Sequence, residues 1–217
     1  MNIAVLGTGL VGQTIASKLV QLGHTVMMGS RSEAHPTAVT WSKDAAGGKA
    51  LFGNFTDACK FGEIVFNCTQ GAASVDALRM GGAGNLKGKI IIDTSNPIEY
   101  SGDEYWKLTV CNTDSLGEQI QREFPDALVV KTLNTVNSNV MVEPDKLIER
   151  TDVFVSGNSA DAKATVTKIL RDWFGWQHVI DLGDITTSRA AEMYVVLWRS
   201  LRLAISSRRF NIKVVTS

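Results

Sequence analysis

Short apolar runs alternate along the chain with stretches in which apolar residues recur every three or four positions. The runs predict buried strands, and the stretches with a helical period predict helices between them. The expected strands cover residues 2–6, 24–29, 49–55, 63–69, 89–97, 127–136, 152–157 and 178–183. The expected helices cover residues 10–23, 34–46, 72–78, 115–124, 161–174 and 192–205.

Three of these helices carry further signals. The inward side of the first is expected to hold Leu10, Val11, Ile15, Leu19 and Leu22. The helix over 115–124 begins with Ser115 and has Glu118 three residues later, which is the spacing of a capping box. The last helix is apolar almost all round, so we expect it to be buried against something. It either covers the acceptor site or forms a homodimer interface, or both, and the alternative is burial within one subunit.

Strands that are nearly continuous runs of Val and Ile, with helices between them, are typical of a parallel sheet covered on both faces. Right-handed crossovers then predict a doubly wound α/β sheet, a Rossmann-type NAD(P)-binding fold, with a smaller C-terminal α/β extension. We expect residues 1–138 to form the dinucleotide-binding domain. Residues 139–217 are expected to pack on the sheet and to contribute the acceptor site and dimer contacts.

The composition narrows the class of protein. The 217 residues include 22 basic and 22 acidic side chains, and this balance gives no support to nucleic acid or an anionic membrane as partner. No apolar run reaches the roughly 18 residues of a membrane-spanning helix, and the N-terminal residues do not resemble a signal peptide. The three cysteines have no CxxC spacing, so neither a disulfide framework nor a metal site is expected. These features predict a reduced, cytoplasmic protein.

A glycine motif follows the first expected strand and opens the first expected helix. It consists of Gly7, Thr8, Gly9, Leu10, Val11 and Gly12, in the pattern GxGxxG. In this context Gly7 allows the tight turn, Gly9 lets the backbone approach a pyrophosphate, and Gly12 lets the helix pack closely on the strand. The N–H groups at the helix start would hold the phosphates. The alternative is a glycine-rich turn without a ligand.

The end of the second strand indicates which dinucleotide is bound. Proteins that bind NAD carry an acidic residue there, about 20 positions after the motif, for the ribose 2′-OH. This chain has Ser30, Arg31 and Ser32 instead. A guanidinium attracts a 2′-phosphate that a carboxylate would repel, and the hydroxyls and N–H groups of the turn could donate to it. NADP(H) is therefore the expected cofactor, unless Arg31 is only a solvated surface residue.

The ends of the later strands supply further candidates, because ligands of such sheets bind beyond the carboxyl ends of the strands. These candidates are Cys68, Thr69, Gln70, Asn96 and Pro97. Main-chain groups after the fourth strand would line the ribose and nicotinamide, and Asn96 would orient the carboxamide or the acceptor ring. The alternative is that these residues only cap turns.

No side chain stands out as a general acid, general base or nucleophile, so no catalytic residue is assigned. Each tyrosine lacks a lysine four positions later, which separates the chain from alcohol dehydrogenases that use a Tyr–Lys pair. Hydride transfer between stacked rings needs close apposition and exclusion of water more than a proton donor. The sequence therefore favours a flavin-type acceptor.

Five further stretches are recognisable: GSRS at 29–32, FNCTQGA at 66–72, IIDTSNP at 91–97, VVKTLNTV at 129–136 and FNIKVV at 210–215. Together they resemble the NADPH-dependent coenzyme F420 reductase family, and the cytoplasmic domains of membrane ferric reductases are similar too. The resemblance covers nearly the whole chain. It implies hydride exchange between NADP and the deazaflavin coenzyme F420, with Thr8 contacting phosphate and Ser30 and Arg31 at the 2′-phosphate.

The chain departs from that family in two places. The family often has a second basic residue shortly after the arginine, whereas residues 33–36 here read Glu-Ala-His-Pro, in which His35 is the only candidate. The segment 204–211, AISSRRFN, is more basic than the family pattern.

The expected function is thus hydride transfer between NADPH and a small flavin-type acceptor, with coenzyme F420 or a flavin foremost, by a homodimer. A ferric or imine reductase, and an NADP-binding sensor without turnover, remain alternatives.

Overall fold

The computed structural model describes residues 1–45, 47–102 and 104–217 and places eight strands in one sheet. The spatial order of the strands is β10-β9-β8-β5-β4-β1-β2-β3. Their bounds are β1 Asn2–Leu6, β2 Thr25–Ser30, β3 Ala50–Asn54, β4 Ile64–Asn67, β5 Ile90–Asp93, β8 Leu128–Thr132, β9 Asp152–Ser156 and β10 His178–Gly183. A separate antiparallel pair consists of β6 Ile98–Glu99 and β7 Lys107–Leu108.

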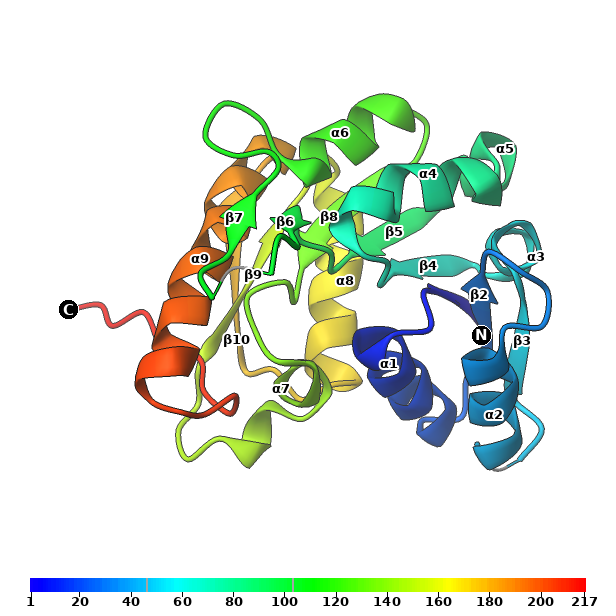
Figure 1. Cartoon of the computed structure of the whole chain (residues 1–217), viewed down its shortest axis with the longest axis horizontal. Helices are drawn as coiled ribbons and strands as arrows, with labels where there is room; N and C mark the ends of the chain where they lie inside the picture. The colour runs from blue at the N-terminus through cyan, green and yellow to red at the C-terminus, as the bar shows by residue number, and fades with distance from the viewer. Residues whose placement is uncertain (46, 103) are drawn as a thin grey trace.

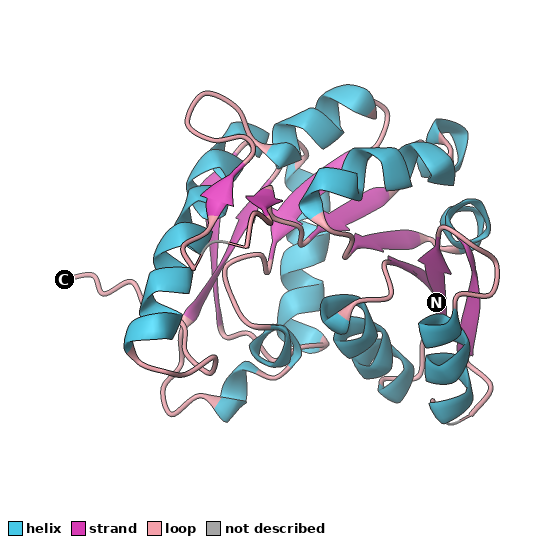
Figure 2. Cartoon of the chain, in the orientation of Figure 1, coloured by secondary structure: helices cyan, strands magenta, loops and turns pink. Residues whose placement is uncertain are grey.

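Helices cover both faces of the sheet (Figure 1, Figure 2). The α-helices are α1 Leu10–Gln21, α2 Pro36–Asp44, α3 Phe55–Phe61, α4 Gly71–Gly81, α5 Ala83–Leu86, α6 Leu116–Glu123, α7 Ser138–Val142, α8 Ala160–Asp172 and α9 Ser188–Ala204. Short 3-10 turns follow at η1 Pro144–Lys146 and η2 Ile185–Thr187. Side chains of α1, α2, α7 and α8 pack in one core, and those of α3, α4, α5 and α6 pack in a second.

The doubly wound arrangement expected from the sequence is confirmed. The order of the strands reverses between β1 and β4, which are adjacent and parallel. This is the topological switch point at which such sheets bind ligands. One strand pair differs from the expected parallel arrangement, because β8 and β9 are antiparallel, with Lys131 opposite Ser156 and Thr132 opposite Val155. The C-terminal strands β9 and β10 thus extend the main sheet.

The structure corrects the expected face of the first helix. Ile15 and Leu19 are fully buried, whereas the side chains of Leu10 and Leu22 are exposed. Leu10 is the first residue of α1 and Leu22 lies beyond its last turn, so neither faces the sheet. Among the described residues α2 ends at Asp44, and its expected end at Ala46 lies outside them.

Helix α3 was not expected from the sequence. It has seven residues and starts where the Asn54 side chain accepts a hydrogen bond from the Asp57 N–H group. Such a short helix spans less than two turns, too few for an apolar period to stand out. The N-cap at Ser115 is confirmed, since the Ser115 hydroxyl accepts from the Glu118 N–H group at 3.1 Å, and the Glu118 carboxylate accepts from that hydroxyl at 2.7 Å.

Helix α9 lies along one edge of the molecule (Figure 1) and is only partly buried. Ala191, Val195 and Trp198 face inward, whereas Met193, Val196 and Leu197 are exposed. Of the three alternatives given for this helix, burial within the subunit therefore accounts for one face only. Among the described residues, no helix combines the length and apolar character needed to cross a membrane.

Candidate functional site

The glycine loop after β1 is built around two contacts that admit no side chain. Gly7 has a φ of +110°, and a Cβ on it would lie 2.6 Å from the carbonyl oxygen of Cys68. A Cβ on Gly12 would lie 2.1 Å from the carbonyl oxygen of Gly7. These contacts pack the start of α1 against the turn and against the end of β4. They match the close helix–strand approach that the sequence predicts.

Gly9 differs from the other two glycines because nothing lies within 4 Å of the position of its Cβ. It is the N-cap residue of α1, and no side chain caps this helix. The Gln13 side-chain amide braces the loop by donating to the Thr8 carbonyl at 2.8 Å. The N-terminus of α1 therefore presents N–H groups to an open space beside Gly9, as an anion-binding loop requires.

A first cavity of about 450 Å³ opens at this loop. Its lining residues are Gly7, Thr8, Gly9, Ser30, Arg31, His35, Phe55, Cys68, Thr69, Gln70, Ala73, Asp76, Ala77 and Met80. The glycine loop, the end of β2 and the segment after β4, which are distant in sequence, thus meet around one space. The expected site residues that do not line it are Leu10, Val11, Gly12, Ser32, Asn96 and Pro97.

The turn after β2 uses the Ser30 hydroxyl internally. This hydroxyl donates to the Ser32 carbonyl at 2.6 Å and accepts from the Ser32 N–H group at 3.2 Å. Donation by both serine hydroxyls to a ligand, as the sequence analysis expected, therefore requires this turn to open. Arg31, by contrast, is exposed and has no carboxylate partner among the described residues.

His35 is a residue of the first cavity whose role the sequence left open. It is the N-cap residue of α2, and its Nδ1 atom accepts from the Thr37 N–H group at 3.3 Å. An Nδ1 atom that accepts a hydrogen bond carries no proton, so Nε2 is the donor of this ring.

A second cavity of about 220 Å³ adjoins the first, and Cys68, Thr69 and Gln70 line both. Its other lining residues are Leu10, Val11, Gly71, Thr94, Ser95, Asn96, Ile98, Tyr100, Trp106, Asn134, Val136, Asn137, Ser138, Met141, Val195 and Trp198. Among these described residues there is no His, Lys, Arg, Asp or Glu. Pro97 does not line the cavity, and its carbonyl accepts from the Thr109 N–H group at 2.8 Å.

Asn96 is held by Asn134. The Asn96 side-chain amide donates to the Asn134 carbonyl at 2.8 Å, and the Asn134 amide donates to the Asn96 Oδ1 atom at 2.9 Å. This reciprocal pair joins the segments that follow β5 and β8. Each Asn96 amide atom keeps only part of its hydrogen-bonding capacity for a ligand.

Aromatic rings form one wall of the second cavity. The rings of Trp106 and Trp198 stack with centroids 6.0 Å apart, and Phe210 stacks on Trp198 at 5.4 Å. The Arg199 guanidinium lies 5.3 Å from the Trp106 ring centroid. The Trp198 indole nitrogen is buried and has no hydrogen-bond partner in the part of the chain that the structure describes. This wall brings together β6–β7, α9 and the C-terminal segment.

A buried charged network supports the floor of this cavity. The Lys131 ammonium contacts the carboxylates of Asp93 and Glu192 and donates to the Ser95 carbonyl at 2.8 Å. Burial by itself would lower the pKa of Lys131, but the two carboxylates raise it above its ordinary value. Asp93 Oδ1 also accepts from Asn67 at 2.8 Å and from the Ser95 hydroxyl at 2.7 Å.

Sequence reasoning missed this network. Its signal was the presence of polar residues inside or at the ends of otherwise apolar strands, at Asn67, Asp93 and Lys131. Cys68, which lies beside the shared part of both cavities, has a pKa raised to about 12, chiefly by burial. Its thiol is therefore neutral at physiological pH.

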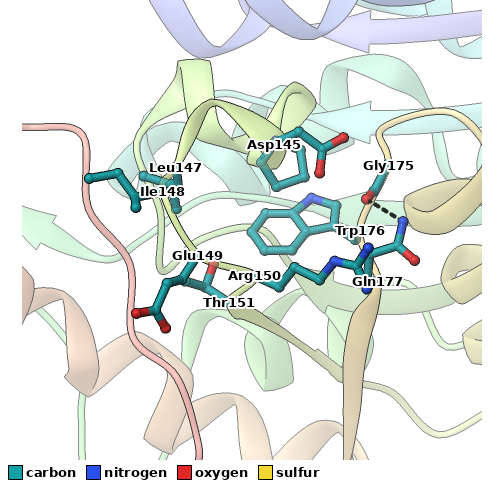
Figure 3. Close-up of a pocket in the computed structure, with 10 residues that line it drawn as sticks. Asp145, Leu147, Ile148, Glu149, Arg150, Thr151, Gly175, Trp176 and Gln177 are labelled. Carbon is teal, nitrogen blue, oxygen red and sulfur yellow. Dashed lines mark hydrogen bonds between the residues drawn. The ribbon is translucent and has the colours of Figure 1, made fainter.

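A third cavity lies away from the expected site residues (Figure 3). It is formed by the loop at residues 144–151 and the turn at residues 175–177 and measures about 200 Å³. Figure 3 shows the C-terminal segment passing beside Ile148. None of the expected cofactor-binding residues lines this cavity.

Comparison with known proteins identifies the relatives of this chain. The family model of the coenzyme F420-dependent NADP oxidoreductases matches residues 2–97. A solved structure from Arthrobacter sp. FB24, a proposed F420-dependent NADP-reductase, is 46% identical, with 99% of each chain covered and a TM-score of 0.93.

The chain is also similar to more distant proteins. The chain is 27% identical to the metalloreductases STEAP3 of Rattus norvegicus and STEAP2 of Homo sapiens, over 88% and 97% of its own length. It spans only 36% and 40% of the length of those proteins. An imine reductase from Myxococcus stipitatus, 15% identical with a TM-score of 0.61 over 94% of this chain and 63% of that one, shares the fold. The chain thus belongs to the family of coenzyme F420-dependent NADP oxidoreductases.

Proposed function

We propose that the chain transfers hydride between NADPH and a flavin-type acceptor, with coenzyme F420 as the foremost candidate. The observation that carries this proposal is the pair of adjoining cavities at the switch point, which share Cys68, Thr69 and Gln70. A dinucleotide has two nucleoside ends joined by a pyrophosphate. The adenosine end would occupy the first cavity, the pyrophosphate would lie at the N-terminus of α1, and the nicotinamide would enter the second cavity.

The preference for NADP rests on the end of β2. Arg31 lines the first cavity and offers a guanidinium to the 2′-phosphate. The carboxylate of Asp76, which lines the same cavity, is paired with Arg79 at 2.9 Å, so its repulsion of an anion is reduced. His35 supplies an additional N–H donor at the same end. These contacts support NADP over NAD.

The acceptor is inferred from the lining of the second cavity. Its aromatic wall favours a flat ring, and its described lining residues supply no acid or base beyond Tyr100 and the neutral Cys68 thiol. Transfer of a hydride to a flavin-type ring needs the two rings in contact and water excluded. An alcohol or imine acceptor would instead require a proton donor close to the reacting atom.

The test is to follow NADPH absorbance under anaerobic conditions with coenzyme F420, flavin mononucleotide, ferric citrate and a cyclic imine in turn. Fast oxidation with coenzyme F420 or the flavin is expected. Oxidation with ferric citrate alone would favour the alternative that the metalloreductase relatives suggest. NADPH binding without oxidation by any acceptor would favour a sensor.

We also propose that the chain acts in the cytoplasm as a homodimer. In this proposal residues 1–138 form the dinucleotide-binding part. Residues 139–217 form the extension that supplies Val195 and Trp198 to the acceptor wall.

A further inference from the structure

Four arginines gather at the C-terminal end of α9 and in the segment that follows it. Arg199 and Arg202 lie one turn apart on the helix, and Arg208 and Arg209 come shortly after its end. Phe210 stacks on Trp198, so the segment that carries Arg208 and Arg209 folds back along the helix.

This arginine cluster, defined as Arg199, Arg202, Arg208 and Arg209, reaches the edge of the second cavity through Arg199. The Arg199 guanidinium lies over the ring of Trp106, and both Trp106 and Trp198 line that cavity. The Arg199 Nε atom donates to the main-chain carbonyl of Glu104 at 2.8 Å, which holds the guanidinium at this edge. A ligand whose ring enters the cavity would therefore meet Arg199 at this edge, and a tail extending beyond it would run toward Arg202 and Arg208, whose charges interact with each other.

In the part of the chain that the structure describes, the four clustered arginines form no ion pair. Among the described residues, Arg79, Arg122 and Arg189 each contact a carboxylate, whereas no carboxylate lies within ion-pair distance of the four clustered arginines. Burial, followed by the positive charges of Arg208 and Arg199, lowers the pKa of Arg202. Like charges held together without a counter-charge disfavour the folded state, and a bound anion would relieve this repulsion.

We propose that the arginine cluster binds an anionic tail on the acceptor whose ring occupies the second cavity. The acceptor class is thus a flat heteroaromatic ring joined to a phosphate-bearing side chain. Arg202 and Arg208 contribute most of the attraction, because Arg199 is already engaged with Trp106 and Glu104. This inference rests on the proposed acceptor site, and it adds the chemical feature by which acceptors are distinguished.

Riboflavin and flavin mononucleotide provide the test, since they share one ring system and differ by a single phosphate. Their affinities for the NADP-bound protein are measured by quenching of flavin fluorescence. Flavin mononucleotide is expected to bind roughly tenfold or more tightly than riboflavin. The substitutions R202Q and R208Q together should abolish this advantage and leave the affinity for riboflavin unchanged. Arg171→Gln, an exposed site on α8, is the matched control and should preserve the advantage.

Inorganic phosphate provides a second arm of the experiment. If the cluster holds the phosphate of the acceptor, free phosphate should weaken the binding of flavin mononucleotide and not that of riboflavin. Equal affinities of the two flavins in the unmodified protein, including the absence of binding by both, would overturn the proposal. So would an equal loss of both affinities in the doubly substituted protein.

Measurement of NADPH oxidation separates this inference from the proposed function. If flavin mononucleotide binds more tightly than riboflavin but is not reduced, the proposed anion site is supported and the proposed hydride transfer to flavins is wrong. If both flavins are reduced with the same KM, the proposed hydride transfer is supported and the proposed anion site is wrong.

Discussion

The ammonium group of Lys131 on β8 lies 2.8 Å from the carboxylate of Glu192 on α9, and neither side chain is exposed to solvent. The same carboxylate accepts the N–H groups of Leu116 and Gly117, each at 2.9 Å, and so caps the start of α6. Glu192 therefore joins one strand and two helices through charge-assisted hydrogen bonds. The position of α9, and with it the aromatic wall of the second cavity, depends on this contact.

Lys131→Met should destabilise the protein strongly, because it leaves the carboxylates of Asp93 and Glu192 buried without a counter-charge. Loss of one partner from a buried ion pair costs about 3–5 kcal/mol. Urea unfolding would measure the difference. Lys168→Met is the control, since Lys168 pairs with Asp172 on the solvent-exposed side of α8, and it should cost no more than about 1 kcal/mol. Similar costs for the two variants would contradict the role assigned to Lys131.

Two glycines of the glycine loop should respond differently to substitution by alanine. Gly12→Ala places a methyl group against the Gly7 carbonyl and should lower stability by about 1–3 kcal/mol. Gly9→Ala meets no protein atom within 4 Å and has a φ of −74°, so thermal unfolding should be unchanged. Both variants should bind NADPH weakly, the second because its methyl group occupies the pyrophosphate position. If the Gly9→Ala variant bound NADPH as tightly as the unmodified protein, the pyrophosphate would have to bind elsewhere.

Arg31→Ala should weaken the binding of NADPH and leave the affinity for NADH nearly unchanged. A charge-assisted hydrogen bond contributes about 1.5–3 kcal/mol, which corresponds to a loss of about ten- to a hundredfold in affinity. Titration of both cofactors by fluorescence would test this selectivity. Arg171→Ala serves as control for the loss of one positive charge. Equal losses for NADH and NADPH would remove Arg31 from the 2′-phosphate site.

Glu118 should make the protein sensitive to acid. Hydrogen bonds from Arg189 outweigh burial and lower the pKa of Glu118 below its ordinary value of 4.5. A carboxyl with a lowered pKa in the folded state stabilises the protein above the unfolded value, and this contribution disappears as the pH falls through the folded value.

Glu118→Gln should therefore lower the free energy of unfolding by about 1–3 kcal/mol at pH 7. The difference from the unmodified protein should shrink at pH values below 4.5. Urea unfolding at several pH values measures it, and a difference that stays constant into the acid range would contradict the assignment. The N-cap should survive in this variant, because the Ser115 hydroxyl accepts from the main chain of residue 118.

The exposed face of α9 leads us to expect a homodimer. Met193, Val196 and Leu197 are 40%, 36% and 54% exposed, and a row of apolar side chains on an outer helix is typical of an interface. Light scattering should give twice the mass of one chain, and Leu197→Glu should give a monomer. Ile148→Glu, at an exposed loop position, should not change the mass. A monomeric unmodified protein would rule out the expected assembly.

Much of the architecture followed from local pattern. Buried strands of a parallel sheet are continuous apolar runs, so β1, β4, β5 and β8 could be recognised from the sequence. The glycine loop could be recognised because its glycines are needed for a tight turn and for close packing between segments that are near in sequence. Helix α3 was missed since it is too short to show a period. The use of the Ser30 hydroxyl by its own turn was missed because hydroxyls bond equally well to ligands and to nearby backbone.

The sequence by itself determined the order of the main strands and most helices, the glycine loop and the replacement of an acidic residue by Arg31, because these depend on the backbone and on neighbours along the chain. Only the tertiary structure decided which distant residues meet. Glu192 stands in an apolar helix, and nothing beside it in the sequence reveals that Lys131 and the start of α6 lie within hydrogen-bonding distance. The arginine cluster likewise depends on Phe210 folding back onto Trp198. Long-range contacts of this kind are set by the packing of the whole sheet and its helices, which no local pattern specifies.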